Sequence, residues 1–290
     1  MTLYLIGLGL SDEKDITVKG LEAVKKCDKI YLESYTSKLE CSHSDLEKFY
    51  CKKVEFANRT FVEDAKQLLS ESKKQNVALL IIGDPLCATT HWDILQRAKE
   101  QDIKTEVMHN ASIINAVGAT GLQVYKFGKT TSIPFPQEKF EPETAYNVIK
   151  ENKTIGAHTL VLLDLKPEEN KFMTVKEAIE ILRKIERKRN EKIFLPKDWC
   201  LGVARLGAHD QKIIAGTATE VSDADFGAPV HALIVPGKLH FMEEEALKQW
   251  KNKPMLAKEL WNLGPVKNKK STQEIKDELR KGWQVLPKTL

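Results

Sequence analysis

The chain has 290 residues, of which 42% are hydrophobic and 30% are charged, and its formal net charge is +4 at pH 7. This length suffices for two modest domains, each with its own core. No run approaches the roughly 20 apolar residues of a membrane-spanning helix, so the composition excludes a membrane role and indicates a soluble globular protein.

In the first 120 residues, apolar runs alternate with helical patterns, which is typical of βαβ units around a largely parallel sheet. The predicted strands are residues 3–8, 29–32, 53–56, 77–82 and 104–108, and the predicted helices are residues 17–26, 62–74, 91–101 and 112–118. The run from Val77 to Ile82 is the most apolar of the chain. Because strands covered on both faces appear as continuous apolar runs, this run predicts the central strand of the first sheet.

The second half shows the same alternation. Its predicted strands are residues 126–133, 159–163, 200–206, 212–217 and 231–235, with a charged amphipathic helix at residues 174–189. Residues 212–217 and 230–235 are close enough in sequence to predict antiparallel pairing, and hence a mixed sheet. We therefore predict an α/β protein with domains at residues 1–120 and 121–250, followed by a basic tail at residues 251–290.

The positive charge belongs to this tail. Residues 251–290 contain ten Lys or Arg against four Asp or Glu, so the rest of the chain carries a net charge of −2. A basic tail can contact RNA or an acidic partner, but solvated lysine-rich helices are the more common explanation. We expect the body of the protein to make no direct contact with nucleic acid.

Polar loops follow three strand ends of the first half. The loop from Gly7 to Asp12 begins like a dinucleotide-binding fingerprint, but Asp12 stands where the third glycine belongs, so a pyrophosphate cradle is not predicted. Asp84 follows the most buried strand, where its carboxylate can stabilise a ligand cation or simply form an Asx-turn. Thr89 to His91, and Ser112 in the next loop, can cap a helix or bind a ligand carboxylate.

Two further residues have both a functional and a structural interpretation. His231 begins an apolar strand and can direct its ring into a cleft, although a hydrogen-bonded strand-end histidine is the more frequent case. Cys87 has no base near it in sequence that would activate a thiolate, so we expect a packing role.

The cysteines and histidines indicate the compartment and the absence of a metal site. The five cysteines are odd in number and scattered, without a Cys-x-x-Cys pair. This usage favours free thiols in a reducing compartment and argues against structural zinc. The seven histidines also lack the i, i+4 spacing of paired ligands, so we predict a cytoplasmic protein without a metal site.

Several longer motifs run in register from residue 1 to about 246. They read LYLIGLGL at residues 3–10, DITVKGL at 15–21, GDPL at 83–86 with ATTH at 88–91, HNASI at 109–113, GLQVYKFG at 121–128, HTL at 158–160 and PGKLH at 236–240. Together they resemble the diphthine synthases, a family of the tetrapyrrole methylase superfamily of class III S-adenosylmethionine-dependent methyltransferases. The tail beyond residue 250 lies outside the resemblance.

The resemblance implies two α/β domains with S-adenosylmethionine in the cleft between them, in a homodimer. It implies a cofactor-binding set consisting of Leu10, Asp84, Cys87, Ser112, Ile113, Leu163, Leu206 and His231. Cys87 stands where small or branched residues are expected, so its contact can be through the backbone or the side chain. No catalytic residue is assigned, because the sulfonium of the cofactor already activates the methyl group.

The resemblance also implies the reaction, which is N-methylation of 3-amino-3-carboxypropyl-histidine on translation elongation factor 2 in diphthamide biosynthesis. Successive transfers yield S-adenosylhomocysteine and trimethylated diphthine or, in the eukaryotic type, diphthine methyl ester. The chain lacks the insertion expected between Lys166 and Phe172 in eukaryotic relatives, and its residues 236–240 look archaeal, so we favour trimethylation. The alternatives are a methyltransferase of this fold acting on a corrin precursor or ribosomal RNA, and a non-catalytic cofactor-binding scaffold.

Overall fold

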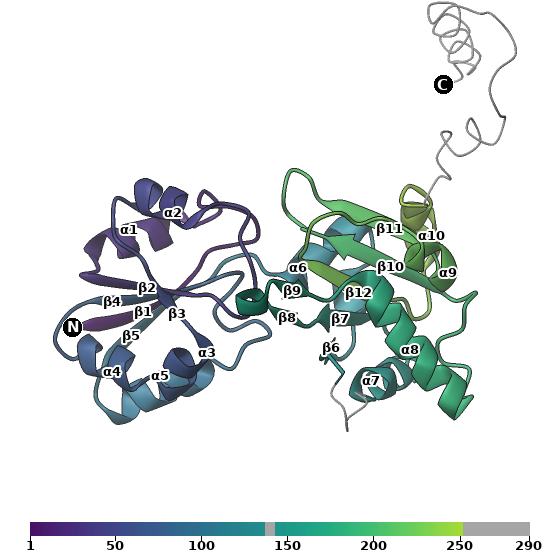
Figure 1. Cartoon of the computed structure of the whole chain (residues 1–290), viewed down its shortest axis with the longest axis horizontal. Coiled ribbons are helices and arrows are strands. Elements are labelled where there is room, and N and C mark those ends of the chain that lie inside the picture. Colours follow the sequence, from purple (N-terminus) through teal and green to yellow (C-terminus); the bar gives the residue numbers. More distant parts are fainter. Residues whose placement is uncertain (137–142, 252–290) are drawn as a thin grey trace, which may run out of the picture. The chain divides into compact units, whose positions relative to one another are not determined.

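The computed structural model describes residues 1–136 and 143–251, in which two five-stranded sheets belong to separate halves of the chain (Figure 1). The first sheet contains β1 (Thr2–Gly7), β2 (Lys29–Glu33), β3 (Glu55–Ala57), β4 (Val77–Ile81) and β5 (Lys104–Met108). All its neighbouring strands are parallel, in the order β3-β2-β4-β1-β5. Every residue of β4 is buried in the middle of this sheet, as its apolar run predicted.

Helices cover both faces of the first sheet (Figure 1). On one face lie α1 (Val18–Lys26) and α2 (His43–Tyr50), and on the other lie α3 (Arg59–Asp64), α4 (Lys66–Ser72) and α5 (Trp92–Glu100). A hydrophobic cluster fills each face. The prediction of one helix at residues 62–74 is wrong, because Ala65 has a φ of 50° and separates α3 from α4.

The second sheet is mixed, as predicted. It contains β6 (Thr131–Ile133), β7 (Thr159–Leu163), β10 (Trp199–Ala204), β11 (Lys212–Thr217) and β12 (His231–Val235), in the order β11-β10-β12-β7-β6. Only β6 and β7 pair in parallel among these neighbours. The predicted pairing of residues 212–217 with 230–235 is wrong, because β10 lies between β11 and β12 and pairs with both. A short turn joins β10 to β11, whereas the longer segment after β11 lets the chain cross to the other side of β10.

Helices also flank the second sheet. On one face pack α7 (Thr144–Thr154), α8 (Val175–Arg189) and α9 (Ala218–Ser222), and on the other pack α6 (Ile113–Ala116), the 3₁₀ helix η1 (Val117–Thr120) and α10 (Phe241–Lys248). Smaller elements are the 3₁₀ helices η2 (Val124–Lys126) and η3 (Pro167–Glu169), and the hairpin of β8 (Leu165–Lys166) and β9 (Lys171–Phe172). The strand predicted at residues 126–133 is shorter than expected, because η2 and an irregular segment precede β6.

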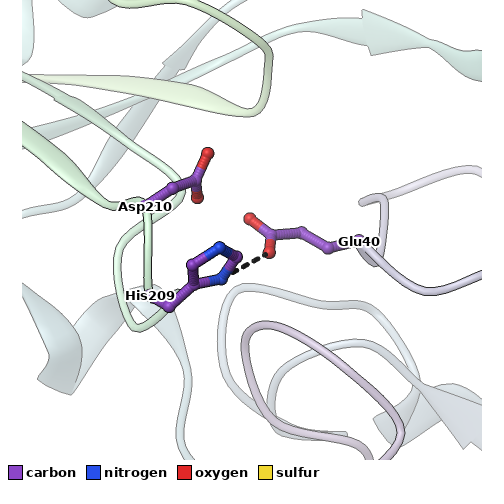
Figure 2. A group of neighbouring side chains, drawn as sticks. All are labelled: Glu40, His209 and Asp210. Atoms are coloured by element: carbon purple, nitrogen blue, oxygen red, sulfur yellow. Dashed lines mark ion pairs between the residues drawn. The ribbon is translucent and has the colours of Figure 1, made fainter.

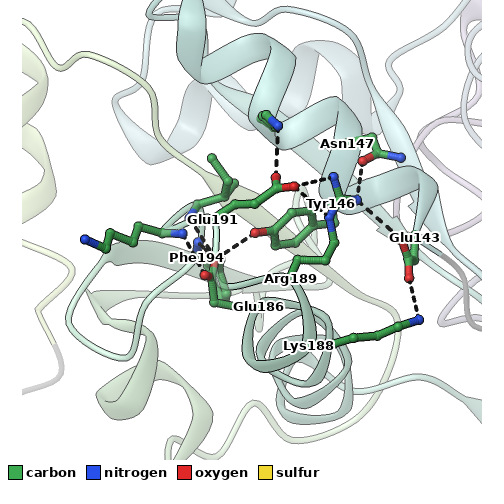
Figure 3. Close-up of polar contacts among 11 residues, drawn as sticks. Glu143, Tyr146, Asn147, Glu186, Lys188, Arg189, Glu191 and Phe194 are labelled. Atoms are coloured by element: carbon green, nitrogen blue, oxygen red, sulfur yellow. Dashed lines mark hydrogen bonds and ion pairs between the residues drawn. The ribbon is translucent and has the colours of Figure 1, made fainter.

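A buried carboxylate joins α7, α8 and the loop after α8 (Figure 3). Glu186 accepts a hydrogen bond from the Tyr146 hydroxyl at 2.8 Å, and backbone N–H groups of residues 192–194 also donate to it. Burial raises the pKa of Glu186, but these hydrogen bonds outweigh it and hold the pKa below its usual value. The Arg189 guanidinium lies over the Tyr146 ring and makes a cation–π contact with it.

No helix within residues 1–136 and 143–251 is long and apolar enough to cross a membrane. The first sheet ends at Met108 and the second begins at Thr131, and the helices α6 and η1 between them pack against the second sheet. Except for Lys251, the predicted basic tail lies outside the described residues.

Candidate functional site

One pocket gathers all eight residues of the predicted cofactor-binding set. Leu10, Asp84, Cys87, Ser112, Ile113, Leu163, Leu206 and His231 all line it, together with residues of the loop after β2. The first half contributes loops at the carboxyl ends of β1, β4 and β5, where open α/β sheets usually bind ligands. Apolar residues from both halves and a few polar groups line the pocket, a composition typical of small-molecule sites.

The glycine turn after β1 has the sharp bend that its sequence predicted. Gly9 has a φ of 84°, and its backbone exchanges hydrogen bonds of 2.7 and 3.3 Å with Gly83 after β4. The Asp15 carboxylate accepts hydrogen bonds from the backbone N–H groups of Leu10 and Ser11, at 3.0 and 2.7 Å. A Cβ atom on Gly9 would lie 2.6 Å from that of Asp15, so only glycine fits the turn.

Asp84 joins the loops that follow β4 and β5. It is 4% exposed, and its Oδ1 accepts a hydrogen bond from Leu86 N, which forms the expected Asx-turn. Its Oδ2 accepts hydrogen bonds from Asn110 N at 3.0 Å and from the His109 ring at 2.8 Å. Burial raises the pKa of Asp84, but these hydrogen bonds hold it below its usual value. The pocket wall therefore contains an ionised carboxylate.

The neighbouring polar residues mainly stabilise their own loops. Ser112 caps α6 in a reciprocal capping box with Asn115. The Thr89 hydroxyl donates to Pro85 O, and the His91 ring also contacts that carbonyl. Burial raises the pKa of Cys87, so its thiol is not activated as a nucleophile, in agreement with the sequence interpretation.

His231 contributes a buried acceptor to the pocket wall. Its Nε2 lies 3.0 Å from Ala228 O, a geometry that places the ring hydrogen on Nε2. Its buried Nδ1 has no hydrogen-bond partner among the residues that the structure describes. Burial also lowers the pKa of His231, which favours the neutral ring. Among the described residues, the ring therefore has a hydrogen-bond partner at Nε2 but none at Nδ1.

Arg205 and Thr36 line the pocket but carried no signal in the sequence that singled them out. Arg205 holds the loops of the second half, because its guanidinium donates to Asp210 and to the carbonyls of Phe226 and Ala228. Thr36 is held by the buried Glu33, whose Oε1 accepts hydrogen bonds from its N–H and its hydroxyl. Apart from the place of Arg205 at the end of an apolar strand, nothing in the sequence pointed to either residue.

Glu40, His209 and Asp210 face one another from opposite halves of the protein (Figure 2). Glu40 Oε2 lies 3.8 Å from His209 Nδ1, and Glu40 Oε1 lies 3.9 Å from Arg205 Nε. Burial and the Asp210 carboxylate raise the pKa of Glu40. Exposed acidic groups often gather without an ion, so we assign no metal to this cluster, which connects the loop after β2 to the loop after β10.

A second depression, which we call the side groove, adjoins the pocket. Its empty volume is about 640 Å³, and it shares four wall residues with the pocket. It is lined by Tyr35, Thr36, Arg59, Ser132, Ile133, Pro134, Leu162, Leu163, Asp164 and Leu165, of which Thr36, Leu162, Leu163 and Leu165 are shared.

Comparisons with known proteins agree with this fold. The family profile described as Tetrapyrrole (Corrin/Porphyrin) Methylases matches residues 2–222. A diphthine methyl ester synthase of Dictyostelium discoideum is 47% identical over 271 residues, covering 87% of this chain and 99% of that protein. A diphthine synthase of Methanococcus aeolicus is 47% identical over 248 residues, with coverages of 85% and 96%. The crystal structure of a putative diphthine synthase from Entamoeba histolytica has a TM-score of 0.82 at 44% identity, covering 87% and 99% of the two chains.

Proposed function

This chain belongs to the tetrapyrrole methylase family and, within it, to the diphthine synthases, and from that membership we propose that its pocket binds S-adenosylmethionine. It is a methyltransferase of diphthamide biosynthesis. Its proposed acceptor is the 3-amino-3-carboxypropyl-histidine of translation elongation factor 2. The observation that carries the assignment of the site is the convergence of all eight predicted residues on one pocket.

The residues of the pocket suit the chemistry of this cofactor. Leu10, Ile113, Leu163 and Leu206 offer apolar side chains to the adenine and thioether parts. The Asp84 carboxylate suits the cationic groups, and the unpaired Nδ1 of His231 suits a hydroxyl or amino donor. When bound there, the cofactor supplies a methyl group on a sulfonium, which needs no further activation.

The chain then has to align and shield the reacting atoms. The acceptor nitrogen forms a bond to the methyl carbon as the carbon–sulfur bond breaks, and the electron pair of that bond remains on sulfur. Only the neutral amine has a free electron pair, so the ammonium loses a proton to water before each round. Such a displacement mainly requires positioning of the two reactants, and the unactivated thiol of Cys87 accords with a mechanism without a covalent enzyme intermediate.

The relatives include both diphthine synthases and diphthine methyl ester synthases, so the product of this chain can be trimethylated diphthine or its methyl ester. The alignment with the Dictyostelium protein spans 271 positions but only 87% of this chain, so it includes residues that this chain lacks. The alignment with the archaeal protein spans 248 positions and 85% of this chain, which leaves almost no gaps. The shorter architecture supports the trimethylated product. Intact mass of the modified factor distinguishes three added methyl groups from four, and four would contradict this assignment.

Methyl transfer itself is tested with labelled cofactor. Elongation factor 2 bearing the unmethylated intermediate is incubated with the chain, and label is expected on the modified histidine. A corrin precursor and ribosomal RNA serve as parallel acceptors, and neither should be labelled. Cofactor binding without transfer to any acceptor would instead support the scaffold alternative.

We also propose a cytosolic homodimer. All five cysteines are free thiols, which suits a reducing compartment and can be checked by cell fractionation. Large apolar side chains are exposed where η2 meets the beginning of α10. They are Val124, Tyr125, Phe241 and Met242, which are 40%, 82%, 68% and 57% exposed. A concentration of exposed apolar residues is typical of an interface.

A further inference from the structure

The side groove adjoins the proposed cofactor pocket, which is where the methyl acceptor must bind. It shares Leu162, Leu163 and Leu165 of the second half with the pocket, and Thr36 of the loop after β2. A molecule in the side groove and one in the pocket would therefore meet at common walls. Methyl transfer requires such contact, because the attacking nitrogen must approach the methyl carbon closely.

Arg59 is the only cation among the described residues that line the side groove. Its guanidinium carbon lies 5.0 Å from the centroid of the Tyr35 ring, a stacking that orients the planar group. Its ion pair with Glu63 measures 3.5 Å between side chains that are more than half exposed, so the pairing is weak. A guanidinium has five N–H donors in a planar fork, and this geometry matches a carboxylate.

Asp164 is the only acidic residue among the described lining residues of the side groove. Its Oδ1 accepts a hydrogen bond from Leu165 N and its Oδ2 one from Phe135 N, both at 2.9 Å. These two bonds fix the carboxylate, and each oxygen retains a further acceptor site. The groove thus presents one fixed anion and one stacked cation.

We propose that the side groove binds the α-amino-acid head group of the acceptor, with Arg59 on its carboxylate and Asp164 facing its amino group. This inference rests on the proposed function, since the 3-amino-3-carboxypropyl group carries an amine and a carboxylate on the same carbon. During transfer, positive charge moves from sulfur to nitrogen. A fixed carboxylate beside that nitrogen stabilises the charge that develops there.

Arg59→Gln tests the carboxylate contact. The full-length variant should lower kcat/KM for elongation factor 2 at least tenfold, mainly through KM, because a charge-assisted bidentate contact is lost. Its affinity for S-adenosylhomocysteine, measured by calorimetry, should change less than twofold. Lys66→Gln is the matched control, since it removes an equal charge from a side chain that pairs with Asp64 outside the groove. Arg59→Lys should restore only part of the loss, because an ammonium cannot bind in the bidentate geometry.

Asp164→Asn tests the amino contact while keeping a side-chain oxygen for one backbone donor. It should lower kcat rather than raise KM, and it should leave mono- and dimethylated products in the mass spectrum. A kcat/KM for Arg59→Gln within twofold of the parental value, or an equal loss in Lys66→Gln, overturns the inference while the proposed function stands. If the parental chain transfers no methyl group to the factor, the proposed function fails and takes this inference with it.

Discussion

Glu243 shows how a single buried charge can serve the fold rather than the chemistry. It is fully buried and accepts hydrogen bonds from His158 Nε2, Gln123 N, His240 N and the Lys126 ammonium. The backbone N–H of Gly237 donates to His158 Nδ1, which keeps the imidazole hydrogen on Nε2. Burial raises the pKa of Glu243, but these donors lower it to about 2.

Glu243→Gln should therefore lower the free energy of unfolding at neutral pH by about 3 kcal/mol, since it removes one partner of a buried ionic network. The depressed pKa stabilises the fold above about pH 4.5, and this contribution is lost as the pH falls towards 2. Denaturant titrations of both proteins at pH 7, 5 and 3.5 check this. The difference between the two proteins should shrink at acidic pH, and a constant difference would contradict the prediction. Glu245→Gln, at an exposed ion pair, is the control.

Asp84→Asn should weaken binding of S-adenosylhomocysteine about tenfold, because it removes the carboxylate charge and keeps an oxygen for only one of the two backbone donors of the loops. Calorimetry measures this affinity. Asp93→Asn on α5 neutralises an exposed aspartate outside the pocket and should leave the affinity unchanged. An unchanged affinity in Asp84→Asn would remove this residue from the proposed site.

At the scale of elements, the turn between β10 and β11 in the second half contacts the loop after β1 in the first half. Gly207 in this turn has a φ of 95°, and a Cβ atom there would lie 2.6 Å from Leu10 Cδ1. The pocket wall at Leu10 thus depends on a glycine in a different half of the protein. Gly227 also has a positive φ, of 69°, but its Cβ atom would meet nothing closer than 3.7 Å.

Gly207→Ala and Gly227→Ala form a matched pair of variants. Each should cost about 1–2 kcal/mol of stability from left-handed backbone strain, measured by denaturant titration. Only Gly207→Ala should also weaken binding of S-adenosylhomocysteine, because its methyl group displaces Leu10 from the pocket wall. Equal affinities in the two variants would show that the contact with Leu10 does not shape the site.

Patterns of apolar residues predicted the main elements because burial imposes those patterns directly. The central place of β4 followed from them, whereas the mixed character of the second sheet was predicted from a strand pairing that the structure does not contain. The break at Ala65 did not, because alanine is the best helix former and nothing local announces its left-handed conformation. The order of β10, β11 and β12 also escaped prediction, because sequence proximity does not show which strands pair across a sheet.

The candidate site also contains residues that the sequence predicted and residues that only the structure reveals. The eight pocket residues came from motifs shared with a family, whereas pattern alone identified only polar loops at strand ends. Arg59 and Asp164 belong to α3 and to the end of β7, and no motif connects them. Only the folded chain brings them into one groove.

At the scale of the whole molecule, the exposed apolar residues beside α10 predict self-association. Sedimentation velocity of the full chain should give a dimer, and the double variant Tyr125→Arg, Phe241→Glu should give a monomer, because two charges then stand where apolar surface was buried. Trp92→Glu, at a 67% exposed residue of α5, is the control and should remain dimeric. A monomeric parental chain would contradict the prediction.

The strand order of the first sheet also has a consequence for synthesis on the ribosome. β1 lies between β4 and β5, which are made some seventy and a hundred residues later. The apolar side chains of Leu3, Leu5 and Ile6 thus emerge long before either neighbouring strand exists. Parallel pairing of this kind assembles late, because distant segments must first meet. The nascent chain therefore carries β1 without a partner until residue 81, the end of β4, has left the exit tunnel, and with one open edge until residue 108 follows.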